Sequence, residues 1–227
     1  MGRPSTPRAA GRRRAARFTG LKPGAWPGQA TWGRFGPGPD LRVAPGTKAG
    51  PYDPGLVAVA TGADSWACTD HGIILDGSRA IMVGIEAFLP VPLSSKSFLE
   101  VYLNRGAVRS AAYFGVSLQG GGEEGVPDAI CVRRDSGLRV SAADRLAPDH
   151  WYRVRLAVPG AGQTGTVWLR DLTAGDEEFR SVTFGASAHD LALTGGDGWR
   201  PALPDLDTLV LRLGGGAQVA SVQLVNE

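Results

Sequence analysis

From residue 56 onward the chain is a series of short runs in which apolar and polar residues alternate, separated by glycine-rich or polar turns. Alternation with period two places the apolar side chains on one face of a β-strand. Only 142–146 and 187–193 hint at a helical turn. We therefore predict an all-β fold, a two-sheet antiparallel sandwich. The runs that predict strands are 56–60, 72–75, 80–89, 98–104, 112–118, 129–134, 138–142, 151–158, 164–171, 181–184, 208–213 and 217–225.

The stretch HWYRVRLAVPGAGQTGTVWLRD, residues 150–171, predicts a hairpin and its register. If both apolar sets face one core, Leu156 pairs with Val167 and Val154 with Leu169, because a slip of one residue would turn one set outward. This register gathers five side chains on the face away from the core, and we predict that they bind a ligand: Trp151, Arg153, Arg155, Trp168 and Arg170. The alternative is a purely structural face, with Arg155 stacked on Trp168, an acid near Arg153 and Arg170, and loops or the N-terminal arm as cover.

Three segments follow from composition. Residues 1–22 are predicted to form a basic, flexible tail, and residues 56–227 are predicted to form the sandwich. Between them, residues 23–55 are rich in proline and glycine, which disfavours helices and central strands. This middle segment is predicted to be an extended arm held by aromatic anchors to its own domain or a neighbour, and those anchors are Trp26, Trp32, Phe35 and Tyr52.

The tail concentrates the basic charge of the chain. Seven of the 24 basic and none of the 22 acidic residues lie in 1–22, so the remainder carries 17 basic against 22 acidic residues. Such a tail predicts nonspecific binding of nucleic acid or another polyanion, centred on Arg12, Arg13, Arg14 and Arg17. The alternative is a solubilising terminus or a misassigned start codon.

No apolar segment of a secretory signal follows the basic start, and no window of about 18 apolar residues predicts a membrane span. The expected location is the cytoplasm as synthesised, or a virion, with secretion only if the start codon is misassigned.

Five segments carry a resemblance to a known family: IMVGIEAFLP, YFGVSLQGGG, AICVRRDSGLRVSA, LAPDHWYRVRLAVPGAGQTGTVWLRDL and LDTLVLRLGGGAQVASVQLVN. Over about residues 56–225 the chain resembles concanavalin A-like and laminin-G-like jelly rolls. The resemblance implies one convex and one concave sheet, and it implies no single function. Jelly rolls of this kind often hold a calcium ion near the sheet edges, and the candidate ligands here are Asp40, Asp53, Asp64, Asp70, Asp205 and Asp207. The alternative is that these aspartates are ordinary turn formers, and no cofactor is firmly predicted.

Catalytic signatures are missing from the sequence. There is no Glu-x-Asp-x-Glu strand, Gln-x-His strand, Gly-x-Ser-x-Gly elbow or nucleotide-binding loop. Glu86 and Glu100 could form a carboxylate pair across neighbouring strands, but single strand acids more commonly neutralise arginines. The three histidines, at 71, 150 and 189, lack metal-ligand spacing, as do Cys68 and Cys131, for which a disulfide and two free thiols both stay open.

Three functions remain. The first is a non-catalytic jelly-roll recognition or attachment module, most simply glycan-binding, with a glycan or a protein as partner. The second is a structural virion protein, a phage tail or capsid-decoration subunit, that forms a homo-oligomer or larger assembly through the arm. The third is a carbohydrate-active hydrolase or lyase with a non-standard site.

Overall fold

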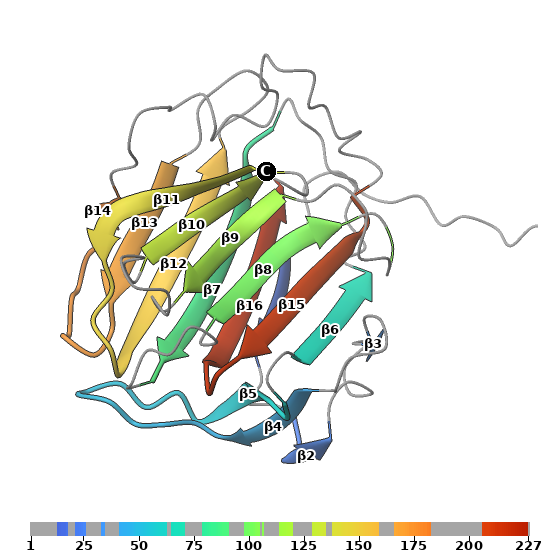
Figure 1. Ribbon diagram of the computed structural model, residues 1–227, viewed down its shortest axis with the longest axis vertical. Coiled ribbons are helices and arrows are strands. Elements are labelled where there is room, and N and C mark those ends of the chain that lie inside the picture. Colours follow the sequence, from blue (N-terminus) through green and yellow to red (C-terminus); the bar gives the residue numbers. More distant parts are fainter. Residues whose placement is uncertain are drawn as a thin grey trace, which may run out of the picture.

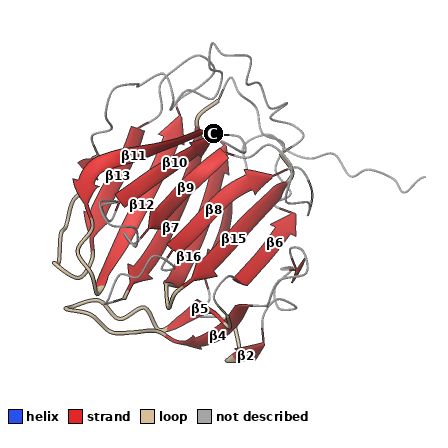
Figure 2. Ribbon diagram, in the orientation of Figure 1, coloured by secondary structure: helices blue, strands red, loops and turns tan. Residues whose placement is uncertain are grey.

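The computed structural model is a sandwich of two antiparallel β-sheets (Figures 1 and 2), and its described residues contain strands and no helix. The all-β prediction is confirmed. Among the described residues, no helix is long and apolar enough to span a membrane. The structure describes residues 13–17, 21–25, 33–34, 41–62, 65–70, 79–90, 98–104, 106, 114–119, 129–134, 138–158, 166–182 and 206–226.

Sheet A contains nine strands, in the order β14-β13-β12-β7-β16-β5-β4-β2, with β1 paired to β16 outside this path. Two strands share one edge of β16: β5 pairs with Gln218 and Val219, and β1 pairs with the stretch from Ser221 to Val225. The strands of sheet A are β1 (Arg13–Arg17), β2 (Gly24–Ala25), β4 (Leu41–Pro45), β5 (Leu56–Ala60), β7 (Ile81–Leu89), β12 (His150–Val158), β13 (Thr166–Asp171), β14 (Arg180–Ser181) and β16 (Gln218–Asn226).

Sheet B contains seven strands, in the order β11-β10-β9-β8-β15-β6-β3. Cys131 on β10 and Cys68 on β6 are separated by three strands of this sheet. At about 4.8 Å per strand spacing, their backbones lie roughly 19 Å apart, whereas a disulfide spans at most ~7 Å between Cα atoms. The strands of sheet B are β3 (Gly33–Arg34), β6 (Ser65–Asp70), β8 (Phe98–Asn104), β9 (Phe114–Gln119), β10 (Ala129–Arg134), β11 (Leu138–Arg145) and β15 (Thr208–Gly214).

The core lies between the two sheets and is lined by every second residue of the long strands. On β7, for example, Val83, Ile85 and Ala87 are buried in the main apolar cluster, whereas Gly84 and Glu86 lie on the opposite face. We call the face of sheet A that points away from this core the outer face. The same alternation on β12 directs Val154 and Leu156 to the core. Arg153 and Arg155 lie on the outer face.

The predicted hairpin register is confirmed, since Leu156 pairs with Val167 and Val154 with Leu169. Eleven of the twelve predicted strands occur, with shifted ends in several. The run 72–75 and the weak helical run 187–193 lie outside the described residues, whereas 142–145 continues β11 and is not helical. The strands β1, β2, β3, β4 and β6 were not predicted.

The tail and the arm both contribute strands that were not predicted from the sequence pattern. Arg13, Arg14 and Arg17 of the predicted polyanion-binding tail belong to β1, whereas Arg12 lies outside the described residues. In the arm, β4 lies between β5 and β2 and buries Leu41 and Val43 in the core. Pro45 is the last residue of β4, where the strand interior is not interrupted by its missing N–H.

Residues 46–55 link β4 to β5 and form a strap over the outer face of sheet A. Gly50 has φ of 55°, and a Cβ there would lie 2.2 Å from the carbonyl oxygen of Thr173, so only glycine permits this close approach. Thr47 exchanges two hydrogen bonds with Gln218: its N–H donates to Oε1 at 2.9 Å, and its hydroxyl accepts from Nε2 at 2.7 Å. These contacts join the strap to β16 and to the turn after β13.

Candidate functional site

Trp151 belongs to the packing under the strap. Its side chain is 0% exposed, and its ring centroid lies 5.4 Å from those of Tyr52 and Phe88. Its indole Nε1 donates to the carbonyl oxygen of Thr47 at 2.7 Å. The sequence placed Trp151 on the correct face, but the strap covers that part of the face, so Trp151 is not accessible to a ligand.

Tyr52 is the one predicted aromatic anchor that lies in the described part of the chain, and it does pack against the domain. Trp26, Trp32 and Phe35 lie outside the described residues. The hydroxyl of Tyr52 also donates to Glu86 Oε2 at 3.1 Å, which links the strap to the middle of β7.

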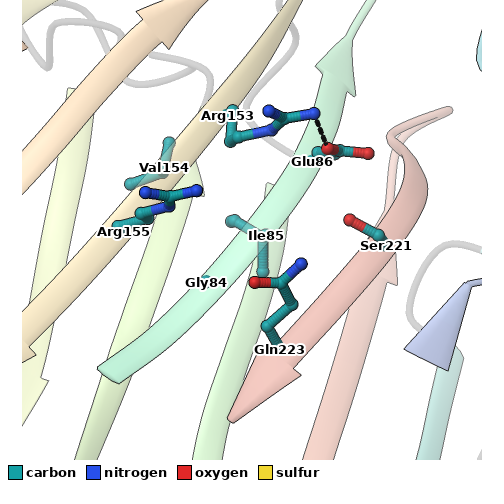
Figure 3. Close-up of a pocket in the computed structure, with 8 residues that line it drawn as sticks. All are labelled: Gly84, Ile85, Glu86, Arg153, Val154, Arg155, Ser221 and Gln223. Atoms are coloured by element: carbon teal, nitrogen blue, oxygen red, sulfur yellow. Dashed lines mark ion pairs between the residues drawn. The ribbon is translucent and has the colours of Figure 1, made fainter. Parts of the chain in front are cut away.

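The two arginines of β12 lie next to a hollow on the outer face (Figure 3). Arg153 is directly opposite Glu86 on β7 and forms an ion pair with it. Arg155 is directly opposite Gly84, and its guanidinium lies 4.2 Å from the ring centroid of Phe179. The hollow is lined by Gly84, Ile85, Glu86, Arg153, Val154, Arg155, Ser221 and Gln223.

Gly84 forms the floor of this hollow because it has no side chain. An added Cβ would find Arg155 Cγ and Gln223 Cβ each at 3.7 Å, on its two sides. The cavity volume is about 10 Å³, room for about one water-sized group, and the hollow opens to solvent. Pockets that enclose a drug-sized ligand measure about 300–1,000 Å³, so a ligand here would lie across the face with only one small group in the hollow.

Trp168 and Arg170 lie on β13, one strand beyond the hollow. Trp168 is half-buried and directly opposite Arg155. Arg170 is directly opposite Arg153, a like-charge pair that would destabilise the sheet without compensation. Glu86 on the adjacent strand compensates Arg153, as the sequence suggested, and Arg170 Nε donates to the carbonyl oxygen of Asp176.

Of the five predicted ligand-binding residues, the structure thus brings Arg153 and Arg155 to the hollow, leaves Trp168 and Arg170 beside it and buries Trp151. Sequence reasoning missed Gly84, Ser221 and Gln223. The alternation in IMVGIEAFLP does place Gly84 and Glu86 on one face. A β-bulge between Val219 and Ser221 obscures the corresponding pattern on β16.

Glu86 and Glu100 do not form a catalytic pair. Glu86 lies in sheet A and Glu100 in sheet B, each on the face turned away from the shared core. Each is paired with an arginine: Glu86 with Arg153, and Glu100 Oε2 with Arg212 Nη1 at 3.0 Å. The simpler expectation, in which single strand acids neutralise arginines, is confirmed.

His150 begins β12, and its Nδ1 lies 2.7 Å from Asp171 Oδ2. The other oxygen of Asp171 accepts backbone N–H bonds from Thr173 and Ala174 at 3.0 and 2.9 Å. Burial raises the pKa of the neighbouring Tyr152 well above its usual range, and the Asp171 carboxylate adds to that rise. This cluster fixes the turn after β13. His71 and His189 lie outside the described residues.

Two of the predicted calcium ligands, Asp53 and Asp207, instead accept hydrogen bonds from groups of the protein. Asp53 accepts from the Gly55 N–H at 3.0 Å and pairs with Lys48 at 2.5 Å, and both contacts lower the pKa of this carboxyl. Asp207 Oδ1 accepts from the Gly106 N–H and the Thr208 hydroxyl, both at 2.8 Å. These aspartates act as turn formers, and the described residues contain no group of three candidate metal ligands. Asp40, Asp64, Asp205 and the side chain of Asp70 lie outside the description.

Comparison with known proteins shows the fold. No protein-family description and no curated protein matches the sequence. Among solved structures, the chain is similar to peanut lectin, with a TM-score of 0.59 and 7% identity over 95% of this chain and 98% of the lectin. Basic winged bean lectin in complex with the Tn-antigen gives 0.55 and 7% over 95% and 99%, and lectin UEA-II in complex with galactose gives 0.53 and 11% over 94% and 98%. The chain therefore has a concanavalin A-like jelly-roll fold.

Proposed function

We propose that this protein is a non-catalytic saccharide-binding module and that the hollow at Gly84 is its binding site. The observation that carries the proposal is the polar rim around a glycine floor: guanidinium groups from β12 and amide and hydroxyl groups from β16 flank a hollow whose floor lies on β7. Sugars are recognised by such convergent donors and acceptors, with an aromatic ring as a platform beside them. Trp168, half-buried on the next strand, provides that ring.

The rim is held rigid, as a binding site requires. Glu86 accepts from Arg153 with one oxygen and from Tyr52 with the other. The guanidinium of Arg153 is thereby fixed before any ligand arrives, which lowers the entropy cost of binding. The lectin fold of the chain agrees with this function, and the lectin structures with galactose and the Tn-antigen show that this fold carries sugar sites in other proteins.

A glycan array probed with the full chain and with Gly84→Leu tests the proposal. The backbone at Gly84 accommodates a Cβ in ordinary contact, so a leucine extends outward and fills the hollow. We expect the wild-type protein to bind a defined set of glycans and Gly84→Leu to lose at least about tenfold in affinity for them. Thr166→Leu is the matched control, because it adds a similar side chain to the outer face of β13 outside the hollow. Equal binding by Gly84→Leu and the control would contradict the proposed site.

A further inference from the structure

The hollow lies between β12, which carries two arginines, and β16, which pairs on its other edge with the arginine-rich strand β1. On one side, β12 supplies Arg153 and Arg155, and its nine residues include no acid. On the other side, β16 pairs with β1, whose sequence is RRAAR, and the register places Arg17 against Ser221. Ser221 and Gln223 line the hollow and belong to β16. On its other edge β16 pairs with the arginine-rich strand β1.

The one carboxylate in the hollow is compensated by the protein itself. Glu86 is only 7% exposed, and its two oxygens accept from Arg153 and from the Tyr52 hydroxyl. Its negative charge is therefore neutralised by the ion pair with Arg153 and does not repel an incoming anion. Glu177 and Glu178 are exposed in the connection that follows β13, at the far edge of the sheet from β1.

Arg155 and Gln223 face each other across Gly84 (Figure 3), at a spacing that the missing side chain leaves open. A guanidinium beside a primary amide offers several N–H donors in one small region. Hydrogen bonds from a charged donor to a carboxylate or sulfate are about twice as strong as neutral ones. The chemistry around Gly84 is therefore better matched to an anionic group than to a neutral hydroxyl alone.

We infer that the ligand is an anionic saccharide, a sugar chain carrying carboxylate or sulfate groups, with one such group held at Gly84 between Arg155 and Gln223. The inference rests on the proposed saccharide-binding function and specifies its ligand class. Further anionic groups along the saccharide lie toward the arginine-rich strand β1. The attraction between these groups and the protein is electrostatic and salt-dependent.

The test is isothermal titration calorimetry of the full chain at 0.05 and 0.15 M salt with two matched pairs of polymers. Polygalacturonate and its methyl ester share one backbone and differ in whether the carboxylate is free or esterified, and dextran sulfate and dextran differ in the sulfate. We expect the anionic member of one pair to bind at least about tenfold more tightly than its neutral partner. The pair that shows this preference identifies the anionic group.

Arg155→Gln should abolish the preference, and Arg42→Gln should leave it intact. Arg42 is an exposed arginine on β4 of the same sheet, away from the hollow, so the two variants lose the same charge. Near-ultraviolet circular dichroism of both variants confirms that they are folded.

The outcomes separate the two hypotheses. Equal binding of the charged and neutral members of both pairs would overturn the inference and leave saccharide binding standing. Failure to bind these polymers and every glycan of the array would overturn the proposed function itself. If polyuridylate binds as tightly as the anionic polymers and Arg155→Gln weakens none of them, the attraction is nonspecific and the inference is also overturned.

Discussion

The Trp151→Ala substitution removes the largest fully buried side chain of the described residues. The indole packs against Tyr52 and Phe88, and its N–H is the donor for the carbonyl oxygen of Thr47. Truncating a buried tryptophan costs about 3–5 kcal/mol of unfolding free energy. Because the substitution also leaves a strap carbonyl without its donor, we expect the upper part of that range, about 4–5 kcal/mol.

Trp168→Ala is the matched control, the same change on the same face of the next strand. Trp168 is partly exposed, so we expect a smaller loss, about 3 kcal/mol. For a chain of this size, each kcal/mol lowers Tm by about 2–4 °C, so the two variants should differ by roughly 3–6 °C. Urea unfolding followed by far-ultraviolet circular dichroism measures both free energies.

A second readout reports on the strap directly. The Lys48 side chain is 75% exposed within the strap, so trypsin can cleave there once the strap opens. We expect cleavage after Lys48 to accelerate in Trp151→Ala and to stay near the wild-type rate in Trp168→Ala. Equal losses of stability in the two variants, with unchanged cleavage, would refute the conclusion that the strap covers Trp151.

Further expectations concern the other parts of the fold. Trp168→Ala should weaken saccharide binding by about tenfold, as measured on the array hits, because it removes the ring beside the hollow; undiminished affinity would contradict this. Gly84→Ala should change the unfolding free energy by less than about 1 kcal/mol, since its Cβ meets only ordinary contacts. Deleting residues 1–55 removes β4 with the buried Leu41 and Val43 and should lower Tm, and light scattering on the same samples tests the predicted assembly through the arm; an unchanged Tm would make the arm dispensable. The raised pKa of Tyr152 means that the unfolded chain ionises first, so stability should be complete below about pH 10 and fall at higher pH, less steeply in Tyr152→Phe.

The hairpin β12–β13 could be derived from the sequence because both of its strands alternate strictly, and only one register turns both apolar sets to the core. β6 was missed because its sequence SWACTD gives the core only small residues, among them Ser65 and Ala67, which are buried without a strong apolar signal. β4 was missed because it lies in a proline-rich segment and its sequence LRVAP offers just two apolar positions to the core.

For the candidate binding site, the sequence pattern predicted which face a residue lies on but not which segment covers that face. Alternation assigned Trp151 to the outer face, but it carries no information about which segment covers that face. The strap does so from a position 104 residues earlier in the chain, through the bond between Trp151 and Thr47. The strand formed by Arg13–Arg17 was equally out of reach, since its pairing depends on the half of the β16 edge that β5 leaves open.

The positions of β15 and β16 determine when this protein can fold during its synthesis. β15 lies in sheet B between β8 and β6, and β16 lies in sheet A between β7 and β5. On the ribosome, the earlier strands therefore emerge as separate groups whose edges cannot be joined until residues 208–226 have left the exit tunnel. Closure of both sheets then requires contacts between segments far apart in the chain, which makes folding slow and leaves strand edges open to other chains in the interval.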